Sequence, residues 1–292
     1  MQSYHFMFWN INLKTKGKDY NKKHDNIHNA ILTMSEKYDL NFILLVEAQQ
    51  LDIESMLQSL NHKKKGKFSL GVTDKVLSIT KQRFVILHTV NNNILQRTDD
   101  KRRILSTAFN INGNDVLINL VHLRDKYNYS DKTLDAYAQY HAEHVRKFEI
   151  ENYSEKSLIV GDFNLNPYQD GMMNVNAFNA IMSPNIVEQG VRKWNGKEYK
   201  YFYNPSWNVL GKQDNDNQVF GTYYYDNNKE VDLAYWYMLD QLILRKDLLK
   251  SYQSSSLKII SNFANVDLLN EKGIPDEREY SDHLPVKFTM KF

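Results

Sequence analysis

The chain of 292 residues contains no cysteine. Neither a disulfide framework nor a thiolate zinc site can therefore contribute to its stability or chemistry, whereas metals bound through oxygen ligands remain open. No apolar run is long enough to span a membrane, and the first residues resemble a strand rather than a secretory signal. We therefore expect a cytoplasmic protein without stable membrane association.

The sequence also lacks internal repeats, low-complexity tracts and any linker rich in proline, glycine or serine. Its composition is that of a folded protein, with 42% hydrophobic and 25% charged residues. Large α/β sandwiches often exceed the usual domain size, so the length alone does not require two domains. A single domain over residues 1–292 is the simpler interpretation.

The net charge is only +2, yet it is unevenly distributed. Residues 1–150 carry 22 Lys and Arg against 16 Asp and Glu, whereas residues 151–292 carry 15 against 19. The first half contains basic runs around Lys14, around Lys64 and at residues 101–103. Such runs are often solvated loops, but three together favour contact with phosphate groups. The candidate substrate-binding residues are Asn12, Lys14, Arg102 and Arg103.

Apolar patterning predicts more strands than helices. The expected strands are residues 4–11, 41–47, 67–73, 76–88, 103–111, 115–123, 157–163, 219–225, 230–238, 257–263 and 284–292. Apolar residues recur at helical spacing in 27–38, 53–60 and 134–148, and Asn112-Gly113-Asn114 predicts a hairpin turn. This order favours an α+β fold, a pair of mixed sheets with outer helices, over a doubly wound parallel sheet.

Four short polar motifs follow or adjoin these predicted strands, where a rigid sheet can direct polar side chains. They are Phe8-Trp9-Asn10-Ile11-Asn12, Leu45-Val46-Glu47-Ala48-Gln49, Gly161-Asp162-Phe163-Asn164-Leu165-Asn166-Pro167 and Ser281-Asp282-His283-Leu284-Pro285-Val286. Their joint occurrence at strand ends is typical of an active site.

Glu47 ends a strongly apolar strand, where an unpaired carboxylate would pay a desolvation cost of several kcal/mol. It needs a lysine partner or a cation, and hydrated magnesium suits one or two carboxylates together with substrate phosphate. The alternative is a surface glutamate that caps the helix after it. Asp162 and Asn164, two residues apart in extended chain, can face one substrate group, although an Asp/Asn turn also fits them.

A histidine oriented by a carboxylate can accept a proton from water near neutral pH. His283, with Asp232 as a candidate partner, fits this role, although Ser-Asp-His is equally common as a cap or loop. His122 and Asn10 each close a strand, where a lone polar residue is more often only a satisfied group at the sheet rim.

Taken together, the motifs resemble those of the endonuclease/exonuclease/phosphatase superfamily, which has the deoxyribonuclease-I-like fold. The resemblance extends from Asn10 to His283, and the motifs occur in the same order as in the family. It implies a four-layer sandwich of two packed mixed sheets flanked by helices, and metal-dependent cleavage of phosphate esters. By resemblance, Glu47 is the principal ligand of Mg²⁺, with Mn²⁺ as an alternative ion, and Asn10 and Asp282 help to place it.

The resemblance also implies roles for the remaining polar residues. Asp162 and Asn164 orient the attacking water and the scissile phosphate, and Asp232 orients His283, the general base. His122 resembles the histidine that donates to the phosphate or leaving oxygen in the deoxyribonuclease and sphingomyelinase branches. A histidine there, rather than tyrosine, argues against the abasic-site endonucleases. Valine before Asp232 and Ala48-Gln49 after the glutamate depart from the family pattern.

Three functions follow as hypotheses. The first is a nuclease that cleaves DNA, or alternatively RNA, with basic runs along the phosphate backbone and aromatic residues in 199–207 and 223–225 stacking on bases or packing in the core. The second is a cytoplasmic phosphatase or phosphodiesterase that acts on phospholipid or inositol-phosphate head groups. The third is an inactive scaffold that only binds a partner, which the retained polar residues disfavour.

Overall fold

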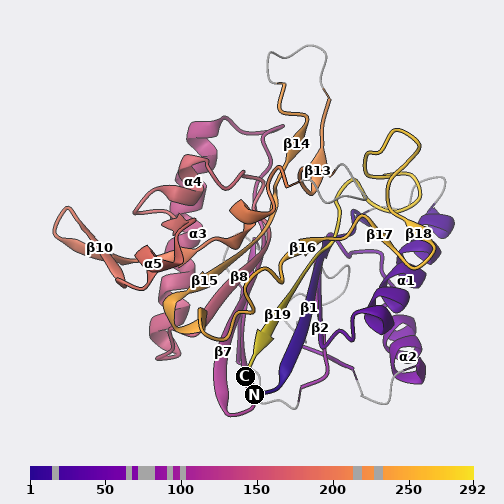
Figure 1. The fold of residues 1–292 in the computed structure, drawn as a ribbon, viewed down its shortest axis with the longest axis horizontal. Helices are drawn as coiled ribbons and strands as arrows, with labels where there is room; N and C mark the ends of the chain where they lie inside the picture. Colours follow the sequence, from indigo (N-terminus) through magenta and orange to yellow (C-terminus); the bar gives the residue numbers. More distant parts are fainter. Residues whose placement is uncertain are drawn as a thin grey trace. The chain divides into compact units, whose positions relative to one another are not determined.

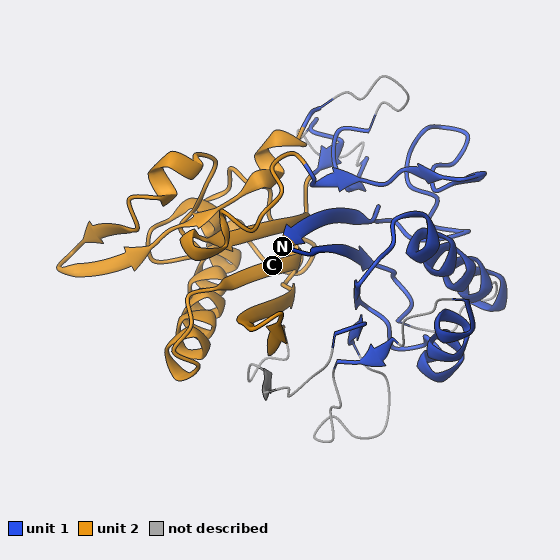
Figure 2. Cartoon of the chain, turned by 60° about the horizontal axis from the view of Figure 1, so that its bottom comes forward, with its two compact units in different colours: residues 1–90, 211–237, 256–290 blue, residues 91–210, 238–255, 291–292 orange. Residues whose placement is uncertain are grey.

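The computed structural model describes residues 1–14, 20–63, 68–71, 83–90, 95–98, 103–212, 219–226 and 233–292. The chain forms two compact units (Figure 2). Unit 1 contains residues 1–90, 211–237 and 256–290, and unit 2 contains residues 91–210, 238–255 and 291–292. Each unit is built around one large sheet. The single domain expected from the sequence stays a prediction.

Unit 1 contains a six-stranded mixed sheet. Its strand order is β16 (Lys258–Ile259), β19 (Val286–Lys291), β1 (Ser3–Asn10), β2 (Phe42–Val46), β4 (Phe84–His88) and β3 (Ser69–Leu70). The strands β1 and β2 are parallel, and β4 runs antiparallel to β2. Two short pairs accompany it, β13 (Tyr223–Tyr224) with β14 (Trp236–Tyr237) and β17 (Asn262–Phe263) with β18 (Val266–Asp267). The parallel pair brings the carboxyl ends of β1 and β2 to one edge.

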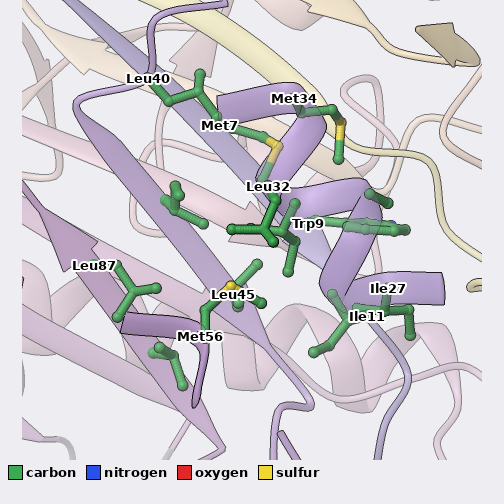
Figure 3. Close-up of a cluster of buried hydrophobic side chains, with 14 of the residues drawn as sticks. Met7, Trp9, Ile11, Ile27, Leu32, Met34, Leu40, Leu45, Met56 and Leu87 are labelled. Atoms are coloured by element: carbon green, nitrogen blue, oxygen red, sulfur yellow. The ribbon is translucent and has the colours of Figure 1, made fainter. Parts of the chain in front are cut away.

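Two helices, α1 (Tyr20–Lys37) and α2 (Ile53–Lys63), lie alongside β1 and β2 (Figure 1). Their apolar residues recur every three or four positions and form one buried face. Figure 3 shows how that face packs: Ile27, Leu32 and Met34 of α1 and Met56 of α2 meet Met7, Trp9, Leu45 and Leu87 of the sheet. This core fixes the strands whose ends carry the polar motifs.

Unit 2 contains a seven-stranded mixed sheet. Its order is β5 (Leu95–Thr98), β6 (Ile104–Ile111), β7 (Asn114–His122), β8 (Ser157–Asp162), β15 (Asp240–Arg245), β12 (Phe202–Tyr203) and β9 (Ala180–Ile181). The long helix α3 (Asp131–Glu151) lies beside it and buries Leu134, Ala138 and Val145 (Figure 1). Smaller elements are α4 (Asp170–Met173), α5 (Pro184–Val187), the hairpin β10 (Val191–Trp194) with β11 (Lys197–Lys200), and the 3₁₀ turns Pro205–Asn208 and Lys246–Leu248.

Most long elements agree with the sequence prediction. The fold class is α+β with two mixed sheets, as expected. Asn112 and Gly113 form the two-residue turn that joins β6 to β7, and both have positive φ, 51° and 78°. Residues 76–82 of one expected strand lie outside the described residues. The strand β15 was not expected, and the segments 219–225 and 257–263 contain only two-residue strands. No described helix is long and apolar enough to cross a membrane.

One buried titratable group in unit 1 links stability to pH. His88, in β4, is fully buried, and burial lowers the pKa of its imidazole to about 4, although a hydrogen bond with the Val90 backbone partly opposes this. In the unfolded chain the pKa of histidine is about 6.5. Between these two values the unfolded chain binds a proton that the folded protein does not, so acid favours unfolding in this window.

We expect the free energy of unfolding to fall as the pH is lowered from about 6.5 to about 4. The contribution of His88 is on the order of 3 kcal/mol. Urea unfolding at several pH values, for the natural chain and for His88→Gln, measures it. The variant should have a flatter profile in this window. An identical pH dependence in both proteins would contradict the assignment.

Candidate active site

In unit 1, two of the polar motifs meet at the edge where the parallel strands β1 and β2 end. Asn10 pairs in register with Val46, so that Asn10 and Glu47 leave the sheet side by side. Glu47 has a φ of 55°, a left-handed conformation that turns the chain sharply out of the strand. Its backbone carbonyl accepts a hydrogen bond from the Leu13 amide at 2.9 Å. Glu47 is buried, and Lys14 Nζ lies 2.9 Å from its Oε1.

The Ser-Asp-His motif is bound to the same strand end. Ser281 Oγ donates to the carbonyl of Asn10 at 2.7 Å, and the Trp9 indole nitrogen donates to the carbonyl of His283 at 2.8 Å. Asn12 Nδ2 donates to Asp282 Oδ1 at 2.9 Å. These bonds join segments about 270 residues apart in the chain. Because they involve backbone carbonyls and a buried indole, they hold the motif rigidly against β1.

A further contact of His283 within unit 1 is with Tyr223. The two residues form an isolated β-bridge, and their rings lie 4.8 Å apart between centroids. The residue His283 is only 6% exposed. A ring packed in this way keeps one orientation, which a general base requires.

Two ammonium groups balance the carboxylates of this cluster. Lys14 pairs with Glu47, and Lys23 on α1 lies within electrostatic range of Asp282, Glu277 and Glu47. Burial lowers the pKa of the Lys23 ammonium, and the three carboxylates oppose that shift. The carboxylates of Glu47 and Asp282 and the amide oxygen of Asn10 are hard donors of the kind that Mg²⁺ prefers. Unit 1 therefore contains oxygen donors of the type that a hard divalent cation takes.

In unit 2, ionisable groups end three neighbouring strands at one edge of the sheet. His122 is the last residue of β7 and pairs in register with Asp162, the last residue of β8. Asp240, the first residue of the antiparallel β15, pairs in register with Asp162 from the other side. His122 Nε2 lies 3.7 Å from Asp162 Oδ2, and carboxylate oxygens of Asp162 and Asp240 lie within 4.8 Å of each other. All three residues are buried.

The Gly-Asp-Phe-Asn motif has the local geometry that this cluster needs. Gly161 has a φ of 152°, and a Cβ there would lie 2.1 Å from the Val121 carbonyl oxygen, so only glycine lets β8 approach β7. Asn164, at a φ of 52°, donates its backbone amide to Asp162 Oδ1 at 2.9 Å and its Nδ2 to the Leu123 carbonyl at 3.2 Å. The Asp162 carboxylate is thereby oriented, and the turn is fixed to the end of β7.

The predicted site residues thus fall into two groups, each described within its own unit. Unit 1 brings together Asn10, Asn12, Lys14, Glu47, Asp282 and His283. Unit 2 brings together His122, Asp162 and Asn164. Arg103 donates from Nη1 to the Leu123 carbonyl at 3.3 Å, close in sequence to the second group. Asp232 and Arg102 lie outside the described residues.

Sequence reasoning missed Asp240. The signal was present, because an aspartate two residues before the apolar run Leu242-Ile243-Leu244 has the same pattern as the other strand-end motifs, in the reverse chain direction. The strand predicted over 230–238 ends two residues before Asp240. The structure begins β15 at Asp240 and places the acidic residue beside Asp162.

No protein-family model and no curated protein matches this chain. Several solved structures do match its fold. The TDP2 of D. rerio complexed with single strand DNA product has a TM-score of 0.56 and 14% identity, over 100% of each chain. An endonuclease/exonuclease/phosphatase family protein from Bacteroides thetaiotaomicron has a TM-score of 0.58 and 14% identity, over 99% of this chain and 98% of that chain. An AP endonuclease from Archaeoglobus fulgidus has a TM-score of 0.54 and 12% identity, over 99% and 100%.

These similarities extend over essentially the whole chain, and at such low identity they establish the fold alone. The fold is that of the endonuclease/exonuclease/phosphatase proteins, which confirms the fold that the resemblance implies.

Proposed function

We propose that the chain is a divalent-metal-dependent phosphodiester hydrolase whose substrate is nucleic acid, with DNA favoured. The observation that carries the proposal is the buried cluster of His122, Asp162 and Asp240 on three adjacent strands. Two close carboxylates and an imidazole are costly to bury, and such groups are typical of functional sites. The solved structures of similar fold include a TDP2 with a single strand DNA product and an AP endonuclease, which supports nucleic acid as the substrate class.

In this proposal the donor set of unit 1, Glu47, Asp282 and Asn10, would hold Mg²⁺, with Mn²⁺ as the alternative ion. When bound, such an ion neutralises charge on phosphate oxygens and polarises the phosphorus. Asn12 orients Asp282 through their hydrogen bond, and Lys14 supplies a second positive charge beside Glu47.

The remaining residues handle the water and the phosphate. His283 accepts the proton of the attacking water at an imidazole nitrogen, and a carboxylate stabilises the imidazolium that forms. By resemblance that carboxylate is Asp232, and Asp240 is a buried, strand-anchored acid in the cluster with Asp162 and His122. Asp162 and Asn164 orient the water and the scissile phosphate. His122 donates to a phosphate or leaving-group oxygen, where negative charge develops.

A panel of substrates tests the substrate class. Purified protein with Mg²⁺ should nick supercoiled plasmid or degrade single-stranded DNA faster than it hydrolyses RNA, phospholipid or inositol-phosphate substrates. The expected reason is that a nucleic-acid strand offers several phosphates to the basic half of the chain. Turnover only on lipid or inositol phosphates would show that these compounds, and not nucleic acid, are the substrate. No turnover on any of them would refute the hydrolase and favour an inactive scaffold.

A further inference from the structure

Arg124 follows His122 by two residues, directly after the end of β7, and the roles above do not use it. The backbone between them belongs to the catalytic cluster of unit 2: the Leu123 amide donates to the Asp162 carbonyl at 2.9 Å, and the Leu123 carbonyl accepts from Asn164. The residue before Arg124 is therefore hydrogen-bonded to both Asp162 and Asn164.

Two aromatic rings hold this guanidinium in place. Its carbon lies 4.2 Å from the ring centroid of Tyr137 and 4.7 Å from that of Tyr129, and the two rings meet edge to face at 5.8 Å. The Nη1 donates to the hydroxyl of Tyr129. Cation–π contacts of this kind fix the orientation of the guanidinium and leave its charge in place. The side chain is half-buried and ordered before any ligand arrives.

The charge of Arg124 has no carboxylate partner in the described part of the chain. Asp125 accepts instead from the backbone and side chain of Asn128, and Asp131 pairs with Lys126 at 3.4 Å. Nε of Arg124 is buried and has no hydrogen-bond acceptor among these residues. A half-buried arginine that is held rigidly but not neutralised is suited to bind an anion, because its side chain loses little further conformational entropy on binding.

We propose that Arg124 binds a phosphate of the nucleic-acid strand next to the phosphodiester that is cleaved, and that Tyr129 and Tyr137 position it for this contact. The inference rests on the proposed function and extends it, because it assigns a second phosphate to the substrate and therefore favours a strand over a single phosphorylated head group. A planar guanidinium can form two parallel hydrogen bonds to phosphate oxygens, which an ammonium cannot.

The test measures binding of a fluorescein-labelled single-stranded DNA oligonucleotide by anisotropy, in EDTA, over a series of salt concentrations. The proteins are the natural chain, Arg124→Gln, Arg124→Lys and the control Lys147→Gln, which removes a positive charge from an exposed position on α3. We expect Arg124→Gln to bind about tenfold more weakly and its log–log salt dependence to be shallower by about one. Arg124→Lys should keep the salt dependence but bind more weakly, and Lys147→Gln should match the natural chain.

Steady-state cleavage of the same oligonucleotide in Mg²⁺ distinguishes a failure of the Arg124 contact from a failure of the proposed function. In Arg124→Gln we expect KM to rise with little change in kcat, because the contact is equally strong in the ground and transition states. One outcome is that the natural chain cleaves DNA while Arg124→Gln shows the same salt dependence and the same KM as the natural chain. In that case the arginine only packs the loop, and the phosphate contact is refuted while the proposed function stands. If the natural chain neither binds nor cleaves DNA, the proposed function fails, and the inference fails with it.

Discussion

Replacement of His283 by alanine is expected to lower kcat on DNA by about 10²- to 10⁴-fold, the range for loss of a general base. The fold should survive, because the interactions that hold this segment to β1 use its backbone. The Trp9 indole donates to the carbonyl of residue 283, and the amide of the same residue donates to Ser281 Oγ at 3.2 Å. Alanine retains both bonds and loses the ring contact with Tyr223.

The measurement is single-turnover cleavage of an oligonucleotide, with urea unfolding of the same samples as the check on the fold. His62→Ala is the matched control, since His62 is exposed in the last turn of α2. It should cleave at the natural rate. Near-normal turnover by His283→Ala, with a cooperative unfolding transition, would remove this histidine from the mechanism.

Replacement of Asp240 by asparagine should have the second-largest effect, a loss of about 10²- to 10⁴-fold in kcat, because it removes one of the two carboxylates from the buried cluster with His122. The same change should raise the melting temperature in EDTA. The carboxylates of Asp162 and Asp240 lie within 4.8 Å of each other in a buried position, so removal of one charge relieves repulsion. Lower activity together with higher stability is a combination that a simple packing defect cannot produce.

Asp232→Asn tests the role that the resemblance gives to Asp232, the orientation of His283. We expect Asp232→Asn to lower kcat by about 10²- to 10⁴-fold as well. A rate within a few-fold of that of the natural chain would remove Asp232 from the mechanism. Calorimetric melting of both variants, alongside cleavage rates, provides the comparison.

The parts of the fold that the sequence predicted are those with continuous local signals. The strand β2 consists of uninterrupted apolar residues, β8 contains the apolar run Leu158-Ile159-Val160, and α3 repeats its apolar positions over about four turns. Asn112-Gly113 predicted its hairpin because few residues accept two successive positive φ angles. In these elements local propensity and burial agree, so a single sequence is enough.

The parts that the sequence missed depend on partners distant in the chain. The two-residue strands β12 and β9 exist because β15 and its neighbours offer free edges, which no local pattern encodes. The hydrogen bond between Asn12 and Asp282 joins residues 270 positions apart, and no local pattern predicts that they meet. Asp240 was overlooked because β15 pairs antiparallel with β8, which places a strand's first residue, instead of its last, at the active edge.

The most direct test of the central claim is the rate at which the purified chain nicks supercoiled plasmid in Mg²⁺, in EDTA, and after Mg²⁺ is restored to the chelated sample. The account predicts nicking in Mg²⁺, loss of nicking in EDTA and full recovery, with Glu47→Gln inactive or strongly impaired at the same Mg²⁺ concentration. Nicking that continues at the same rate in EDTA, or no nicking under any of these conditions, would contradict it.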